Sequence, residues 1–433
     1  MNHSSGRTFL VAAVLSVVLG ACGSTTGGSG SPGSHPTGPV VIAAFNPFSG
    51  PDASFGPEIL VSCNAAAQLI NNVGGINGQH LNCVSSDTHG DPADAVAAAE
   101  KLIATTTNLV GLIGPSSDEA LATSPIFEHA HIPMFADTGQ AAYDKTPLQY
   151  FWRVTAADDA KGNAMAIWAI RQGYKHAAAV FGNDAGAQAD VPALKAAYAK
   201  LGGSMDTSLN VALDQASYRT EIQQMLAQQP QVIFTETDPQ TAATFLSEVV
   251  QLNHTLLPTI GTETSFQAPY VQAVTQSVGN DQLSANFVAV QPYAPATGDA
   301  YQIFKTAELA APGASASDLS TYAADPFAMS YYDSVNIMAL AMVAAGTSDP
   351  ATYNKFVSKV TASTQGATKV YSFDQGRKAL ARGQSIQYVG ASGDITFDAF
   401  HNSSGSFQVA RLNAAADAAP LGVVTAADIA KVR

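Results

Sequence analysis

The chain has 433 residues, of which 46% are hydrophobic and 12% are charged, a composition typical of a globular protein. Its length is sufficient for more than one hydrophobic core. The 34 acidic residues outnumber the 20 Lys and Arg residues and give a formal net charge of −14. This negative charge disfavours binding to a phosphate backbone, so we expect no nucleic-acid partner.

The first residues have the pattern of an export signal. Arg7 precedes an apolar stretch, residues 9–19, which is too short to span a bilayer. The stretch ends in Leu-Gly-Ala-Cys, which resembles the bacterial lipobox, in which the cysteine is diacylated and becomes the first mature residue. We therefore expect a signal peptide at 1–21, lipidation of Cys22 and a flexible Gly/Ser/Thr/Pro-rich tether at 22–38. The alternative is an ordinary signal peptide with an incidental cysteine.

From residue 40 onward, short apolar strands alternate with segments of helical periodicity, which predicts an α/β fold with mainly parallel sheets. The 394 remaining residues would suit two lobes of ~200 residues each. The expected strands are 40–45, 81–85, 109–113, 133–136, 151–154, 177–181, 232–235 and 259–261. The expected helices cover 59–73, a segment from 91 through 102, a segment from about 117, and 160–172, 191–201 and 241–252.

Cys63 and Cys83 form an even pair once Cys22 is lipidated. Disulfides persist in the oxidising compartment that an export signal implies, so we predict that these two cysteines are bonded. The bond would join the first helix to the second strand. The alternative is two reduced, buried thiols.

Ligands of open parallel sheets bind at the carboxyl ends of the strands, next to helix N-termini. After strand 109–113, Ser116 or Ser117 could cap a helix, and Ser116 and Glu119 have the spacing of a capping box. These hydroxyl and N–H groups could bind a ligand carboxylate, although a serine that only caps its own helix explains the pattern equally well.

Polar residues also follow two later strands. Thr138 and Gln140 come after strand 133–136, and Glu263 comes after strand 259–261. A carboxylate at position 263 could pair with a ligand ammonium, although a lone Glu after a strand is more often solvated.

Motifs for catalysis or for cofactor binding are absent from the sequence: there is no Gly-x-Ser-x-Gly, no Gly-x4-Gly-Lys-Ser/Thr and no His-Glu-x-x-His. His129 and His131 are two residues apart at a helix end, a spacing that turns their rings to different faces and favours surface residues over metal ligands. The glycines at 74, 75 and 78 follow a helix, so they predict a turn and no dinucleotide site. We expect no catalytic residue, no cofactor and no metal.

Several segments together resemble the branched-chain amino-acid (Leu/Ile/Val-type) binding proteins of ABC importers, which have the type I periplasmic binding fold. The resemblance extends from residue 40 to about residue 412, and its segments follow the order of the family. They are Phe48-Ser49-Gly50-Pro51 with Phe55-Gly56, 70–78, 91–99, Ile113-Gly114-Pro115, Arg153 with Asp158-Asp159 and Gly162, Tyr332-Asp333-Ser334-Val335, 388–393, and Phe397-Asp398.

The resemblance implies two Rossmann-like lobes joined by a three-stranded hinge, with a solute buried when the lobes close. Lobe 1 would comprise 39–154 and 284–403, and lobe 2 would comprise 155–283 and 404–433. It also implies a disulfide at Cys63 and Cys83.

The same resemblance assigns ligand-binding roles. Ser117 matches the carboxylate-binding serine if one residue is deleted from the preceding turn, and Thr138 and Gln140 fall in the loop that completes that pocket. Glu263 matches the carboxylate that takes the ligand's ammonium. Phe55 matches the aromatic residue that covers the ligand, and Asp158 matches a hinge-side acidic residue.

The sequence departs from the family at two aromatic positions. Gly186-Ala187 replaces the usual Tyr-Gly, and Asp238 stands where an aromatic residue is expected before Pro239. A branched-chain aliphatic ligand therefore does not follow from the resemblance. Asp238, Glu236 and Glu263 would make the wall contributed by lobe 2 acidic, which points to a cationic or amine-bearing solute.

We predict a monomeric, lipid-anchored solute-binding protein without enzymatic activity, which delivers an amino acid or related small polar solute to the permease and ATPase of an ABC importer. One rival is a ligand-sensing module that signals to a membrane partner. Another is a lipid-anchored hydrolase, for which the sequence offers no assembled nucleophile and base.

Overall fold

The computed structural model describes residues 38–50, 52–403, 405–413 and 420–432. The predicted signal peptide, nearly all of the predicted tether and Cys22 lie outside these described residues. Among the described residues, no helix is both long enough and apolar enough to cross a membrane. The fold is α/β with mainly parallel sheets, as predicted, and the strands pair into two large sheets and one small one within the described ranges.

The first large sheet has five described strands in the order β2-β1-β3-β4-β5, and all of its pairings are parallel. Its strands are β1 (Val40–Asn46), β2 (Leu81–Asp87), β3 (Leu109–Ile113), β4 (Met134–Ala136) and β5 (Phe151–Arg153). Helix α1 (Phe55–Asn72) and helix α12 (Pro326–Ala345) pack in one core with Ile42 and Ala44, whereas helices α2 (Pro92–Thr105) and α3 (Ser117–His129) pack in another with Ala43 and Phe45. Successive residues of a strand face opposite sides, so helices cover both faces of this sheet.

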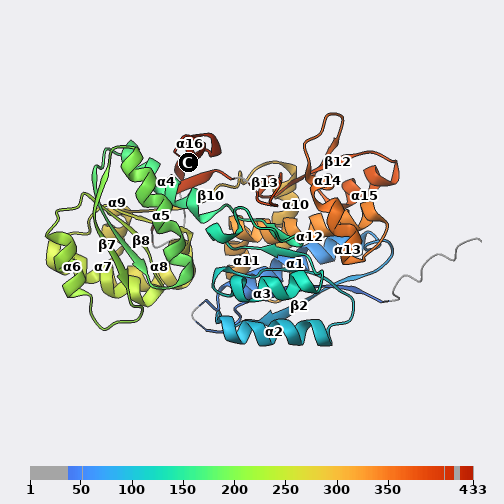
Figure 1. Ribbon diagram of the computed structural model, residues 1–433, viewed down its shortest axis with the longest axis horizontal. Helices are drawn as coiled ribbons and strands as arrows, with labels where there is room; N and C mark the ends of the chain where they lie inside the picture. Colours follow the sequence, from blue (N-terminus) through green and yellow to red (C-terminus); the bar gives the residue numbers. More distant parts are fainter. Residues whose placement is uncertain (1–37, 51, 404, 414–419, 433) are drawn as a thin grey trace, which may run out of the picture. The chain divides into compact units, whose positions relative to one another are not determined.

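The second large sheet has seven described strands in the order β15-β14-β10-β9-β8-β6-β7. Its strands are β6 (His176–Gly182), β7 (Ser204–Val211), β8 (Val232–Glu236), β9 (Thr259–Gly261), β10 (Phe287–Pro292), β14 (Phe407–Arg411) and β15 (Pro420–Val424). Phe181 packs with α4 (Asp158–Arg171) and α5 (Ala185–Lys200), and Val180 packs with α6 (Arg219–Leu226), α7 (Pro239–Asn253) and α8 (Ala268–Val278). Figure 1 shows β7 and β8 with these helices around them.

The remaining elements are a small sheet, several further helices and three short 3-10 turns. A small sheet pairs β11 (Thr368–Val370), β12 (Ile386–Gly390) and β13 (Gly393–Asp394). The other helices are α9 (Asn280–Asn286), α10 (Gly298–Leu309), α11 (Ala316–Tyr322), α13 (Pro350–Tyr353), α14 (Val357–Thr361), α15 (Phe373–Ala381) and α16 (Ala426–Ala430). Short 3-10 turns span Ala141–Tyr143, Glu263–Phe266 and Asn354–Phe356.

The pairing of strand β10 concerns the expected boundary at residue 284, where the chain was predicted to return to lobe 1. It pairs in parallel with β9 and antiparallel with β14, so Phe287–Pro292 belongs to the seven-stranded sheet. The expected return to lobe 1 at residue 284 would have placed this strand with the other sheet. We therefore propose that the chain returns to lobe 1 after Pro292, and the division into lobes is otherwise kept as predicted.

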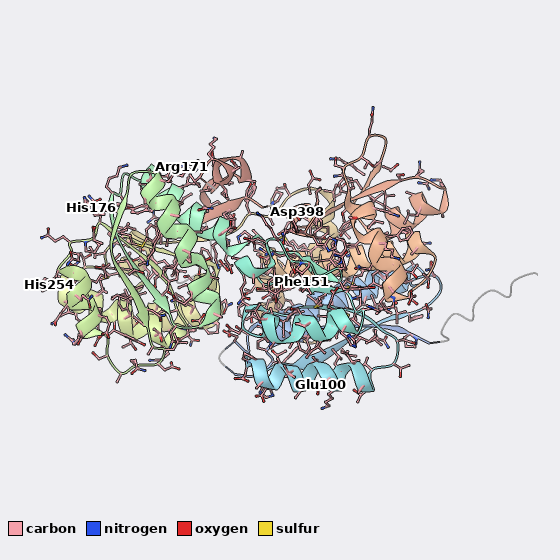
Figure 2. All side chains as sticks on the ribbon, viewed as in Figure 1. Glu100, Phe151, Arg171, His176, His254 and Asp398 are labelled. Carbon is pink, nitrogen blue, oxygen red and sulfur yellow. A yellow bond between two sulfur atoms is a disulfide. The ribbon has the colours of Figure 1, made fainter. Side chains whose placement is uncertain are left out.

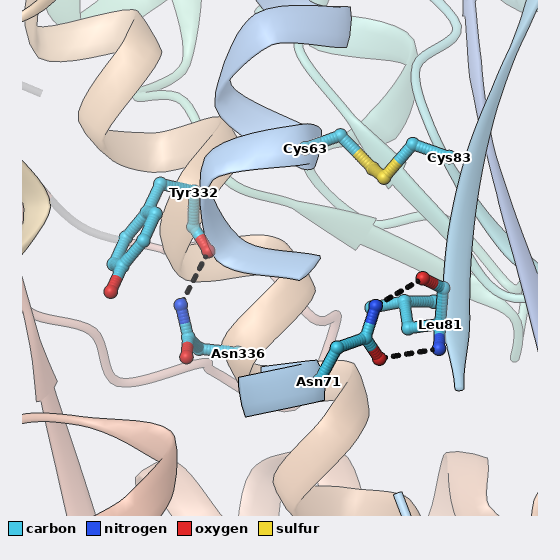
Figure 3. The surroundings of a disulfide bond; sticks show 6 residues. All are labelled: Cys63, Asn71, Leu81, Cys83, Tyr332 and Asn336. Carbon is cyan, nitrogen blue, oxygen red and sulfur yellow. Dashed lines mark hydrogen bonds between the residues drawn. A yellow bond between two sulfur atoms is a disulfide. The ribbon is translucent and has the colours of Figure 1, made fainter. Parts of the chain in front are cut away.

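The predicted disulfide is confirmed. Cys63 of α1 and Cys83 of β2 are bonded, with their Cα atoms 6.1 Å apart. Near this bond, the side chain of Asn71 donates to the carbonyl of Leu81 and accepts from its N–H, at 2.9 and 2.8 Å (Figure 3). One covalent bond and two hydrogen bonds therefore fix the first helix against the second strand.

Surface and core residues separate as expected for a globular fold. Glu100 projects from the exposed side of α2, whereas Phe151 of β5 is fully buried (Figure 2). Asp91 caps α2 as predicted, because its side chain accepts hydrogen bonds from the N–H groups of Ala93 and Asp94.

Candidate functional site

A cavity of about 640 Å³ lies at the carboxyl ends of strands from both large sheets. The segments after β1, β3 and β4 supply one wall, which we call the first wall. The start of α4 and the segments after β6, β8 and β9 supply the other, which we call the second wall. This is the position at which open parallel sheets bind their ligands.

The first wall presents a hydroxyl supported from behind. Ser117, the first residue of α3, lines the cavity, and its hydroxyl lies 3.1 Å from that of Thr138. The side-chain amide of Gln140 donates to the carbonyl oxygen of Ser117 at 2.9 Å. Thr138 and Gln140 are buried and do not line the cavity, so they hold Ser117 in place.

Ser116 is the N-cap residue of α3, but its side chain makes no capping hydrogen bond. Its hydroxyl donates instead to Glu119 at 2.8 Å, and Thr88 donates to the other oxygen of the same carboxylate at 3.0 Å. The capping box suggested by the spacing of Ser116 and Glu119 is therefore wrong in detail. The buried Glu119 carboxylate draws the hydroxyl away from the backbone of the helix.

The first wall also carries three carboxylates that the sequence analysis did not select as binding residues. Burial raises the pKa of Asp52 to about 6, with further contributions from nearby acidic groups. Burial likewise raises the pKa of Asp118 to about 7, with Asp52 and Asp184 adding to the effect. The pKa of Asp137 is raised to about 7 by burial, although the hydroxyl of Tyr331 donates to it at 2.9 Å. No ion pair joins these three side chains to any Lys, Arg or His of the described residues.

The second wall is built around one buried ammonium. Lys161 of α4 lies 2.9 Å from Glu263, and its side chain is only 7% exposed. The same Nζ atom lies 3.3 Å from Asp190, 3.5 Å from Glu236 and 3.6 Å from Asp158. We call these five residues the Lys161 cluster. Burial alone would lower the pKa of Lys161, but the surrounding carboxylates outweigh burial and raise it.

The Lys161 cluster holds more negative than positive charge. Four carboxylates surround a single ammonium, and burial raises the pKa of Asp158 to about 6 despite the attraction of Lys161. Glu263 was predicted to take a ligand ammonium, and one of its oxygens already accepts from Lys161. Its other oxygen, Oε2, has no hydrogen-bond partner among the described residues. This oxygen is the part of Glu263 that a ligand could still use.

Two further acidic residues of the second wall cap helices. Asp184 accepts a hydrogen bond from the N–H of Ala187 at the start of α5, and Asp238 accepts from Gln240 and Thr241 at the start of α7. Only Oδ1 of Asp238 makes these bonds, and Oδ2 has no partner among the described residues. Asp238 can thus cap its helix and contribute charge to the cavity at once.

The structure brings most of the sequence-predicted residues together. Those that line the cavity are Phe55, Ser117, Asp158, Asp238 and Glu263, whereas Thr138 and Gln140 stand behind Ser117. Five further charged residues line the cavity and were not predicted from the sequence as site residues: Asp52, Asp118, Asp137, Lys161 and Asp184. Lys161 was not predicted because its nearest carboxylate partner, Glu263, lies 102 residues away in the chain.

The chain has a two-lobed α/β fold with a cavity at the strand ends of its two large sheets. The family model of the periplasmic binding proteins matches residues 39–416, and the chain belongs to this family. The members of this family are extracytoplasmic binding proteins. The predicted family resemblance is confirmed.

Individual relatives agree with this assignment. An amino acid binding protein of Pseudomonas aeruginosa is 28% identical over 130 residues, which are 30% of this chain and 34% of that protein. The chain thus matches about a third of the length of this curated relative.

Solved structures share the fold over most of their length. A leucine binding protein of Thermotoga maritima has a TM-score of 0.71 at 17% identity, covering 90% of this chain and 99% of that one. A solute binding protein of an R. palustris ABC transporter, in complex with benzoate, has a TM-score of 0.69 at 18% identity, covering 90% and 97%.

Proposed function

We propose that the protein captures an amino acid or a related small polar solute between its two walls and delivers it to an ABC importer. The observation that carries this proposal is the cavity of about 640 Å³, lined from strand ends of both large sheets. Its volume is within the range of small-molecule sites. The permease and ATPase of the importer would be its partners, and lipidation of Cys22 would anchor it as a monomer outside the cytoplasmic membrane.

Each end of an amino acid would meet a suitable group. Ser117, which lines the cavity at the first turn of α3 and whose hydroxyl contacts Thr138, would receive the carboxylate. Oε2 of Glu263 would receive the ammonium beside Lys161. Phe55, at the start of α1, would cover the apolar part of the solute, and Asp158 would lie beside the ammonium. The ammonium would then be paired with a carboxylate and the ligand carboxylate would be hydrogen-bonded, inside a largely desolvated site.

Calorimetric titration with a panel of amino acids, amines, amides and aromatic acids tests this function. We expect saturable binding of at least one solute, at one site per chain. Glu263→Gln should weaken that binding by ~2 to 4 kcal/mol because it removes the charge opposite the ammonium. Glu100→Gln is the matched control, because Glu100 is exposed on α2 and does not line the cavity, so it should bind as the unaltered protein does. Equal losses in both variants would contradict the role of Glu263.

A further inference from the structure

We propose that the solute of this cavity is an organic cation with a net positive charge, carried on protonated amines or a guanidinium group. This inference rests on the proposed function and names the substrate class of the same site. Eight carboxylates line the cavity, and Lys161 is the only Lys or Arg among its described lining residues. A solute that brings positive charge would relieve their mutual repulsion.

The carboxylates face the solute from both walls. Asp52 and Asp118 belong to the first wall, and Asp184, Glu236 and Asp238 belong to the second. The groups are close enough for electrostatic repulsion across the cavity, since Asp184 and Glu236 act on both Asp52 and Asp118. An organic cation held between the walls would be attracted to both of them at once.

Unused hydrogen-bonding atoms support a bound donor. Asp158 is 7% exposed and lines the cavity, yet its Oδ2 atom has no hydrogen-bond partner among the described residues. The hydroxyl of Thr237, a lining residue that is 5% exposed, is also without a partner in the described part of the chain. Buried polar atoms are nearly always hydrogen-bonded, so such atoms beside a cavity point to a ligand with polar groups, and the carboxylate oxygen of Asp158 would accept from an N–H group of that ligand.

The cavity suits an organic cation better than a metal ion. A bare ion needs only a handful of converging ligands, whereas the walls enclose about 640 Å³. Within the described ranges, no group of three or more His, Cys, Asp or Glu side chains has the arrangement of a metal site. Aromatic rings also line the cavity, among them Phe55, Phe327 and Tyr331. Such rings attract ammonium and guanidinium groups through their faces and pack against aliphatic stems.

Thermal shift and calorimetry with matched probes test this inference. The cationic probes are 1,4-diaminobutane, spermidine and arginine, and the comparison probes are leucine, glutamate and benzoate. We expect saturable binding of at least one cationic probe. Its dissociation constant should be at least tenfold lower than that of any comparison probe, which is a difference of ~1.4 kcal/mol in binding free energy. An increase in salt concentration of about tenfold should weaken that binding in the unaltered protein, because screening reduces the attraction.

Charge-removing variants locate the site. Asp118→Asn and Asp238→Asn should each weaken binding of the cation about tenfold or more, since each removes one charge from a desolvated wall. Asn caps helices as well as Asp does, so Asp238→Asn keeps the start of α7 intact. Asp349→Asn is the matched control, because Asp349 is the exposed N-cap residue of α13 outside the cavity, and it should leave affinity unchanged.

The outcomes separate the two proposals. Binding of leucine, glutamate or benzoate, with all cationic probes silent, would overturn the cationic substrate class and leave a solute-binding function in place. Cation binding that is insensitive to salt and to both cavity variants would also overturn it. A failure of every probe to bind would contradict the solute-binding function and the substrate class together.

Discussion

The two walls of the cavity are stabilised by different means. The first wall rests on the Cys63–Cys83 disulfide, which fixes α1 to β2, and on the hydrogen bonds of Thr138 and Gln140 to Ser117. Behind this wall, the buried guanidinium of Arg153 donates to the carbonyl of Gln140 and pairs with Asp144. The second wall rests on a buried ion cluster, in which Lys161 compensates four carboxylates. Among the described lining residues, the second wall has the only Lys or Arg side chain, Lys161, whereas Arg153 lies behind the first wall and does not line the cavity. The carboxylates of the first wall are therefore left for the ligand.

Loss of the ammonium should have the largest effect. Lys161→Met would leave four carboxylates around an apolar side chain and should lower the free energy of unfolding by ~3 to 5 kcal/mol. Urea unfolding measures this loss. The control is Lys195→Met on the exposed side of α5, which should change stability by less than ~0.5 kcal/mol. Similar values for the two variants would mean that the Lys161 cluster does not stabilise the second wall.

Removal of the disulfide in the first wall should have the next largest effect. It should lower the stability of the protein and leave solute affinity unchanged. The double variant Cys63→Ala, Cys83→Ala should lower the free energy of unfolding by ~3 kcal/mol in the chain-entropy account. Solute affinity should stay the same, because neither cysteine lines the cavity. Urea unfolding and calorimetry on the same sample check both statements. A loss of binding with little loss of stability would show that the bond shapes the site directly.

The carboxylates of the first wall predict a pH dependence. The pKa values of Asp52, Asp118 and Asp137 are raised by burial to about 6, 7 and 7 from an ordinary value of 3.8. At pH values between the ordinary pKa of 3.8 and the raised pKa values of about 6 and 7, the folded protein binds more protons than the unfolded chain. The free energy of unfolding therefore falls as the pH rises through this range. Urea unfolding without ligand should therefore give a lower free energy of unfolding at about pH 8 than at about pH 5.

Asp118→Asn should make this pH dependence shallower, because the amide does not titrate. The control is Asp349→Asn, a substitution of an exposed residue that does not line the cavity. A stability that rises steadily over the same pH range would show that these groups are ionised without cost in the folded protein.

The smallest expected effect concerns the hydroxyl of the first wall. Ser117→Ala should weaken the binding of a carboxylate-bearing solute by ~1 kcal/mol, which is the usual contribution of one hydrogen bond. Calorimetry with the tightest such solute measures it, and Ser358→Ala on the exposed side of α14 serves as control. Unchanged affinity in Ser117→Ala would place the ligand away from α3.

Much of the fold follows from local patterns in the sequence. Strands β3 and β9 match their predicted ranges, because each is a short buried run between turn residues. Strand β7 was missed, since Ser204–Val211 is an edge strand of the sheet and alternates exposed polar residues with buried ones. Helix α5 begins at Ala185, six residues before the predicted start, in a segment whose glycine and aspartate weaken the helical pattern.

The site was less predictable than the fold. Residues directly after strands, such as Ser117, Asp238 and Glu263, could be selected because strand ends converge in a parallel sheet. The Lys161 cluster could not, because Lys161 and Asp190 lie on two different helices, Glu236 is the last residue of β8 and Glu263 follows β9. Only the packing of α4 against α5 and the sheet brings these charges together.

Hydrogen exchange of the backbone with and without a bound solute tests the central claim most directly. The bound solute should slow the exchange of backbone amides in both walls. The slowed amides should lie around residues 116–119 in the first wall and around residues 184–188 and 236–240 in the second wall. Residues far from the cavity, such as those of α15, should exchange at unchanged rates. Protection restricted to one wall, or centred on a surface outside the cavity, would contradict a solute held between the strand ends of the two sheets.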